Sequence, residues 1–199
     1  MEETFGPSFH EDLQIPFTEQ LAREAWLTLS SMARRGVASP TASSAGRLFD
    51  AAAALIGLYR RVEYEAQAPM KLEAIAQRSA KAYAFDLHDE GDGLILDPTP
   101  TVREIVGDIR RGETQARIAG RFHATFVAML AEAAERMARR TGIELVALSG
   151  GTFLNRIIIE DLMDELERRE LRPIMHRATP AGDGCVSLGQ AVVAQARWQ

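Results

Sequence analysis

Cysteine is almost absent from this chain of 199 residues, in which Cys185 is the only one. A single thiol excludes an internal disulfide framework and a metal site built from several cysteines, and it fits a reducing compartment. No apolar run approaches the roughly 18 residues that a membrane span needs, and the acidic residues 1–14 do not resemble a signal peptide. We therefore expect a cytoplasmic protein that does not enter a membrane.

An excess of basic residues is also missing, because 28 acidic residues outweigh 23 lysines and arginines and give a formal net charge of −5. Such a balance gives no electrostatic footprint for nucleic acid or for an anionic membrane surface. Hydrophobic residues at 46% and charged residues at 26% are typical of a globular protein, and the chain is long enough to bury a sizeable core. We expect no nucleic-acid partner.

Hydrophobic periodicity predicts a helical first half with one β-hairpin, followed by an α/β second half. The helices of the first half are expected over 16–35, 46–58, 70–80, 101–110 and 113–140. The hairpin is expected within 81–100, with its turn at Gly91-Asp92-Gly93. A strand at 143–149, a helix at 155–171, a strand at 172–177 and a helix at 184–198 follow. This order favours a mostly parallel sheet with helices packed around it.

The stretch VALSGGTFLNRIIIEDLM, residues 146–163, predicts a strand that passes through Ser149-Gly150-Gly151 directly into a helix. Backbone N–H groups left open by glycines at the positive end of a helix dipole suit a phosphate group. Turns of this kind are also common as plain tight connections, and Asn155 can act as the helix N-cap. The turn by itself leaves both interpretations open.

Asp183 lies between glycines in PAGDGCVSLG, just before the last predicted helix. It either caps that helix or presents its carboxylate to a ligand or a divalent metal, since zinc and hard cations accept Asp oxygen. Ligands of open α/β sheets bind at the carboxyl ends of the strands, so this turn and the glycine turn are expected to lie side by side. His176 is either a ligand at a strand end or a packed or surface histidine.

A third candidate is SSAGRLFD, residues 43–50. Gly46 permits a close backbone approach, Arg47 can pair with an anion, and Asp50 can accept hydrogen bonds from a ribose diol. The alternative is a helix start in which a serine is the cap, Arg47 is solvated and Asp50 is a carboxylate favoured by the helix dipole. The small-residue turn YEAQAP, residues 64–69, either frames a flat ring or is simply a turn.

Four stretches occur together in a characteristic order, TASSAGRLFDAAAALIGL, YEAQAPMKLEAIA, VALSGGTFLNRIIIEDL and HRATPAGDGCVSLGQAVVA. In order and approximate spacing they resemble the C-terminal lobe of HypF-type carbamoyltransferases, which are hydrogenase maturation proteins. The resemblance covers residues 36–199 and leaves residues 1–35 as a lead-in with an N-terminal helix. It implies the C-terminal lobe of an actin/Hsp70/sugar-kinase-like (ASKHA) fold, related to the enzymes that make threonylcarbamoyl-adenosine on tRNA.

The resemblance also implies an activity and a site. The family module uses ATP or carbamoyl-adenylate and passes the carbamoyl group to the C-terminal cysteine of a partner maturation protein, towards the cyanide ligands of the nickel-iron hydrogenase cofactor. Each implied site residue is carried over by its matching motif: Gly46 and Asp50 at the ribose, Glu65 and Ala66 beside the nucleoside, Gly150, Gly151 and Asn155 at the phosphates, and Asp183 on a divalent metal such as zinc, iron or magnesium.

Two motifs depart from the family wording. Ala66 stands where the turn Tyr-Glu-Gly-Gln has glycine, and Gly182-Asp183-Gly184-Cys185 stands for Asn-Asp-Gly-Gly. The family's upstream domains and first lobe, which carries paired metal-binding histidines, have no counterpart before Gly36. The histidines of this chain form no His-x3-His pair and are His10, His88, His123 and His176.

A single Asp holds a metal poorly without further ligands. We therefore expect this lobe to work with a first lobe or upstream HypF domains and to be inactive without them, as a split subunit or an excised segment. The alternative is a degenerate, non-catalytic assembly module that keeps the fold and self-associates as a homodimer or pairs with a separate first lobe. No Gly-x4-Gly-Lys-[Ser/Thr] pattern occurs, which argues against a P-loop-like kinase.

Overall fold

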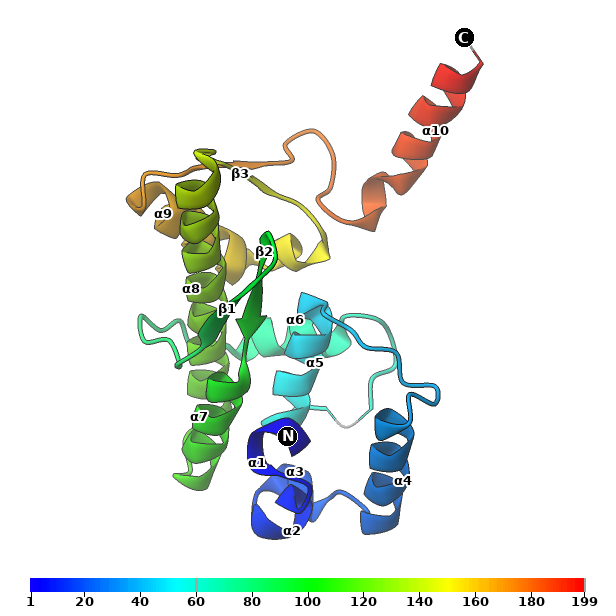
Figure 1. Ribbon diagram of the computed structural model, residues 1–199, viewed down its shortest axis with the longest axis vertical. Coiled ribbons are helices and arrows are strands. Elements are labelled where there is room, and N and C mark those ends of the chain that lie inside the picture. The colour runs from blue at the N-terminus through cyan, green and yellow to red at the C-terminus, as the bar shows by residue number, and fades with distance from the viewer. Residues whose placement is uncertain (60, 199) are drawn as a thin grey trace. The chain divides into compact units, whose positions relative to one another are not determined.

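The computed structural model describes residues 1–59 and 61–198, and these separate into two compact units, Met1–Thr125 and the part from Phe126 onward (Figure 1). The first unit is built from α1 Glu2–Phe5, α2 Phe9–Asp12, α3 Pro16–Glu19, α4 Arg23–Arg34, α5 Ala45–Leu55, α6 Gln67–Ile75, β1 Asp86–Glu90, β2 Gly93–Asp97, α7 Thr99–Arg110 and the beginning of α8, Gln115–Thr141. The second unit is built from the rest of α8, β3 Leu145–Leu148, the 3₁₀ helix η1 Gly151–Leu154, α9 Arg156–Arg168, β4 Arg172–Met175, the 3₁₀ helix η2 Asp183–Cys185 and α10 Val186–Arg197. The predicted α/β class is confirmed, with small sheets.

The β-hairpin forms where alternation predicts it. Its strands β1 and β2 pair antiparallel, from Asp86 opposite Asp97 to Glu90 opposite Gly93. The leucines of both strands are half-buried, and most of the side chains between them are exposed. This pattern of one half-buried face and one solvated face is typical of a two-stranded antiparallel ribbon on the surface of a unit.

The single helix predicted over 16–35 is wrong, because two helices, α3 and α4, occupy this range. The buried Thr18 hydroxyl donates to the Leu13 carbonyl and accepts from the Ile15 amide at 3.3 Å. These bonds fix the N-terminus of α3, because Thr18 is its third residue and its side chain bonds the N-cap residue Ile15. Ala22 is extended, with φ −60° and ψ 122°, before α4 begins. The predicted end of α4 is right, since Gly36 follows it with φ 64°.

The helix predicted over 70–80 is α6, which starts earlier and ends at Ile75. Beyond it the chain crosses α8 very closely. The Gln77 amide donates to the Ala116 carbonyl at 2.9 Å, and a Cβ on Gly120 would lie 1.6 Å from the Gln77 carbonyl oxygen. No side chain fits in that space, so glycine at position 120 is required by the fold of the first unit.

A buried polar network fixes the next part of the chain on α7 and α8. The Asp108 carboxylate, whose side chain is 6% exposed, accepts from the Tyr83 hydroxyl at 2.8 Å and from the Arg121 guanidinium at 2.6 Å. Arg111 donates to its other oxygen, and the Arg121 guanidinium carbon also lies 3.9 Å from the centre of the Tyr83 ring. Burial and the hydrogen bond to Asp108 raise the pKa of the Tyr83 hydroxyl far above its usual range, so Tyr83 acts here as a donor.

The second unit has one continuous hydrophobic core, made by α8, β3 and α9. Its buried members are Val127, Ala131, Leu148, Leu162, Leu166 and Leu171. Apolar residues of α9 recur at a spacing of four, which places Ile158, Leu162 and Leu166 on one face of the helix. This face is fully buried, and it holds α9 and the strand that follows it in place.

Strands β3 and β4 pair parallel, with Leu145 opposite Arg172 and Leu148 opposite Met175. Parallel pairing is what the alternation of strands and helices predicts. In the described part of the chain this sheet contains two strands only, which makes it smaller than the mostly parallel sheet expected from the sequence. Among residues 1–59 and 61–198, no helix has the length and apolar character needed to cross a lipid bilayer.

Candidate functional site

The glycine turn after β3 differs from its prediction in one respect, because the strand does not enter α9 directly. Gly150 takes φ 102°, and the short 3₁₀ helix η1 separates it from α9. Asn155 is the N-cap of α9, and its side-chain oxygen accepts from the Ile158 amide at 3.0 Å. The capping interpretation of Asn155 is therefore confirmed. The glycine amides lie at the start of η1 and not at the N-terminus of α9.

The turns after β3 and β4 lie side by side, as expected for adjacent parallel strands. The Gly150 amide donates to the Ala181 carbonyl at 2.7 Å. A Cβ on Gly182 would lie 3.5 Å from the Gly151 Cα, so the two glycine-containing segments approach each other backbone to backbone. This contact places Asp183 in the chain segment directly next to the glycine turn.

Asp183 does not have the capping role that was one of its two interpretations. It starts the three-residue helix η2, and the N-cap of α10 is Cys185, which makes no side-chain capping bond. The Asp183 side chain is exposed. Its carboxylate is therefore open to solvent at the edge where the two turns meet.

A serine and a histidine meet at the same edge. The Ser149 Oγ lies 2.9 Å from His176 Nε2, and the Thr179 Oγ1 lies 3.3 Å from His176 Nδ1. Both Ser149 and His176 are exposed. The sequence left His176 as either a ligand at a strand end or a packed or surface histidine, and the structure places it on the surface. The signal for its contact with Ser149 is that each of the two is the first residue after a parallel strand.

In the first unit, the start of α5 satisfies its own polar groups. The Ser44 side chain is the N-cap and accepts from the Arg47 amide at 3.4 Å. The Arg47 guanidinium pairs with the Asp50 carboxylate at 3.0 Å. The alternative of a capped helix start is therefore right about the serine, whereas Arg47 is paired. At Gly46 a Cβ would meet no atom within 4 Å, so a ligand can approach the backbone there.

Glu65 and Ala66 lie directly before α6, which packs against α5 in the first unit (Figure 1). Both residues are exposed. Ala66 is the N-cap residue of α6 and takes the left-handed conformation, with φ 62° and ψ 7°. This conformation costs an L-residue with a Cβ about 1–2 kcal/mol, and it is the position where the resembling family wording has glycine.

The predicted site residues are thus divided between the two units. Gly46, Asp50, Glu65 and Ala66 belong to the first unit, and Gly150, Gly151, Asn155 and Asp183 belong to the second. Within each unit the structure brings the motifs together, α5 with α6 and the glycine turn with the Asp183 segment.

One group of possible metal ligands occurs elsewhere in the described residues, on the hairpin. Donor atoms of Asp86, His88 and Asp97 all lie within 4.8 Å of one another. Their present contacts explain part of this cluster, because Asp97 accepts from the Thr99 amide at 2.8 Å and lies 3.5 Å from His88 Nε2. Hydrogen bonding with the Thr99 side chain lowers the pKa of Asp97 most strongly, and the Thr99 amide and His88 lower it further.

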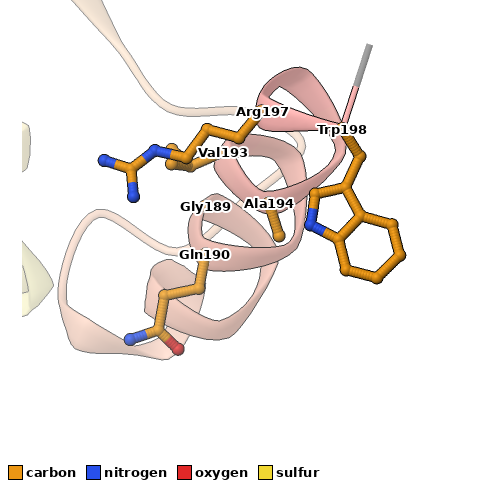
Figure 2. Close-up of a pocket in the computed structure, with 6 residues that line it drawn as sticks. All are labelled: Gly189, Gln190, Val193, Ala194, Arg197 and Trp198. Atoms are coloured by element: carbon orange, nitrogen blue, oxygen red, sulfur yellow. The ribbon is translucent and has the colours of Figure 1, made fainter.

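A hollow of about 530 Å³ follows one side of α10 (Figure 2). Its lining residues are Gly189, Gln190, Val193, Ala194, Arg197 and Trp198. All of them come from one helix and the residue that follows it, and none is a predicted site residue. The hollow is an exposed helix face and does not enclose a ligand site.

Comparison with known proteins decides the family. Residues 5–190 match the family described as carbamoyltransferase, Kae1-like domain, second subdomain. The chain belongs to this family. It is 38% identical over 167 residues to carbamoyltransferase HypF of Rhizobium leguminosarum bv. viciae, an alignment that covers 84% of this chain and 21% of that protein. It is 34% identical over 185 residues to a carbamoyltransferase HypF homolog of Cupriavidus necator, covering 88% of this chain and 45% of that protein.

The fold is also that of a HypF carbamoyltransferase. A crystal structure of full-length HypF in the phosphate- and nucleotide-bound form matches with a TM-score of 0.85 at 34% identity, over 94% of this chain and 24% of that one. The resemblance that four sequence motifs indicated is thus confirmed. The chain spans less than half of the length of these curated relatives, and about a fifth of HypF from Rhizobium leguminosarum.

Proposed function

We propose that this chain is the nucleotide-binding second subdomain of an ASKHA-like carbamoyltransferase, and that it works together with a first subdomain. In this role it binds ATP or carbamoyl-adenylate with a divalent metal, and its enzyme passes the carbamoyl group to the C-terminal cysteine of a partner protein in nickel-iron hydrogenase maturation. The observation that carries the proposal is the match over 94% of the chain to a HypF that was crystallised with phosphate and nucleotide.

The proposed roles in the second unit follow from what the turns offer. Gly150 and Gly151 carry no side chains at the carboxyl end of a parallel strand, so a phosphate can approach the exposed Gly151 backbone there, while the Gly150 amide is already bonded to the Ala181 carbonyl. Asn155 supports this turn by capping α9. It does so from a buried position, 9% exposed, so we assign it a positioning role beside the phosphates and not a direct contact.

The proposed roles in the first unit concern the nucleoside. Gly46 leaves open space above the first turn of α5, and Asp50 can accept hydrogen bonds from ribose hydroxyls while it keeps its ion pair with Arg47. Glu65 and Ala66 form the exposed turn before α6, where a flat base can lie against small side chains.

Asp183 fits a divalent metal by its chemistry, since it is an exposed carboxylate between two glycines next to the proposed phosphate turn. When bound there, the metal would neutralise phosphate charge. The other ligands must come from phosphate oxygens, water or the first subdomain, because one carboxylate does not fill a coordination sphere. No comparison favours the alternative of a non-catalytic assembly module.

The test is titration calorimetry with ATP and Mg²⁺, on the chain alone and mixed with the first subdomain of a HypF relative. We expect binding in the mixture, and we expect Asp183→Ala to weaken it by about tenfold or more, as loss of one charged ligand does. Asp164→Ala is the matched control, since Asp164 is an exposed carboxylate on α9 of the same unit. Absence of binding at millimolar ATP in both settings would refute the proposal.

A further inference from the structure

We propose that His176 is a positioning residue that holds the Ser149 hydroxyl ready to donate a hydrogen bond to an anionic oxygen of the ligand at the glycine turn. This inference rests on the proposed nucleotide site and adds two residues to it. It begins from strand register. Leu148 lies opposite Met175 in the parallel pair, so Ser149 and His176 leave the sheet together, and the Ser149 Oγ reaches His176 Nε2 at 2.9 Å.

The imidazole is held from its other side as well. His176 Nδ1 lies 3.3 Å from the Thr179 hydroxyl. A neutral imidazole has one donor and one acceptor nitrogen. With the proton on Nε2, the ring donates to Ser149 and accepts from Thr179, and the hydrogen of the Ser149 hydroxyl is left to point towards a ligand. In this arrangement each ring nitrogen and each hydroxyl group has a defined role as hydrogen-bond donor or acceptor.

The position of the pair favours a ligand over a purely structural role. Ser149 directly precedes Gly150, whose amide donates to the Ala181 carbonyl at 2.7 Å. This bond fixes the backbone next to Ser149 at the start of the turn. Both side chains of the pair are exposed, and exposed hydrogen bonds of this kind contribute little to stability. A hydroxyl donor beside the exposed backbone of Gly151 is the chemistry that recognises a phosphate oxygen.

The experiment is a double-mutant cycle on ATP affinity, measured with Mg²⁺ in the mixture of this chain and the first subdomain of a relative. Ser149→Ala and His176→Ala are each expected to weaken binding about tenfold, since each removes or misdirects one hydrogen bond to a charged group. The double variant is expected to bind as Ser149→Ala does, because both changes act through the same hydroxyl.

His176→Gln is expected to restore part of the loss, since its amide can bond both Ser149 and Thr179. The thermal unfolding midpoint should stay the same for all four variants. Losses that simply add in the double variant, or a His176→Ala protein with the affinity of the parent, would overturn the proposal.

A measurement without nucleotide separates this inference from the proposed function. Nitrogen-15 NMR of the histidine rings is expected to show the Nε2-protonated tautomer at His176 and a change at His176 in Ser149→Ala, with the His88 ring as internal reference. If the parent protein fails to bind ATP, the nucleotide site is wrong, and the NMR result decides the Ser149–His176 pair. An unchanged His176 spectrum in Ser149→Ala refutes the pair.

Discussion

Ala66 occupies the backbone conformation that most favours glycine, at the start of α6. The Cβ of an L-residue collides with its own backbone there, at a cost of about 1–2 kcal/mol. The sequence identified this position as a departure from the family wording, in which the residue is glycine. The structure adds the physical consequence, which is strain stored beside the proposed nucleoside site.

We predict that Ala66→Gly raises the free energy of unfolding by about 0.5–1 kcal/mol, because relief of the strain exceeds the added entropy of the unfolded chain. Urea denaturation at constant temperature measures it. Ala51→Gly is the matched control, since Ala51 is exposed within α5 and glycine there should lower the stability by about 1 kcal/mol. A loss of stability in both variants would show that Ala66 is not strained.

Gly120 and the pair Gly46 and Gly151 differ in what the surrounding structure requires of them. Gly120 is needed by the fold, because any Cβ would overlap the Gln77 carbonyl. At Gly46 and Gly151 a Cβ would meet no atom within 4 Å, and alanine would stabilise the α5 helix at position 46 by up to about 1 kcal/mol. Packing gives no reason for glycine at these two positions. Their open space is available to a ligand, as the proposed function requires.

At the level of helices and strands, periodicity predicts elements whose apolar residues face one core. The hairpin, α5, α7, α8 and α9 all satisfy this condition, and each appears within a few residues of its predicted range. The break between α3 and α4 depends on the extended backbone of Ala22, and η1 depends on the Gly150 backbone angle. Neither feature changes the hydrophobic pattern, so neither could be predicted from it.

The network that joins α7 and α8 predicts an acid-sensitive stability. Burial alone would raise the pKa of Asp108, but the Tyr83 hydroxyl and the Arg111 and Arg121 guanidinium groups outweigh it and hold that pKa below its usual value. A carboxyl with a lowered pKa in the folded state stabilises the fold above the unfolded pKa of about 3.9, and this contribution disappears as pH falls through the folded pKa.

We predict that Asp108→Asn lowers the free energy of unfolding at pH 7 by about 2–3 kcal/mol, because it removes the buried carboxylate that accepts hydrogen bonds from Tyr83, Arg111 and Arg121. The difference from the parent should shrink as the pH falls below about 4. Urea unfolding at pH 7 and at pH 3 measures both effects. Asp164→Asn, an exposed change on α9, should have no such effect, and an equal loss at both pH values would contradict the ionic role of Asp108.

At the scale of the whole chain, the family could be predicted because four motifs occur in the right order, although each motif alone had a plain structural explanation. Asn155 and Ser44 show the limit of that approach, since both are helix caps and a cap has the same sequence signature with or without a ligand. Side-chain directions, such as that of His176 towards Ser149, depend on strand register and could not be predicted from motif order.

The presence of one thiol in the whole chain allows a direct test of where the ligand binds. Cys185 is half-buried in η2, two residues after Asp183, and its Sγ lies 3.4 Å from the Gly182 carbonyl oxygen. We predict that ATP with Mg²⁺, in the presence of a first subdomain, slows alkylation of Cys185 by N-ethylmaleimide, because ligand at this turn restricts access to the thiolate.

Asp183→Ala should remove the protection of Cys185 and Asp164→Ala should keep it. Binding detected by calorimetry with no change in the alkylation rate would place the nucleotide away from the Gly182–Cys185 turn, and the assignment of Asp183 to the metal would then be wrong.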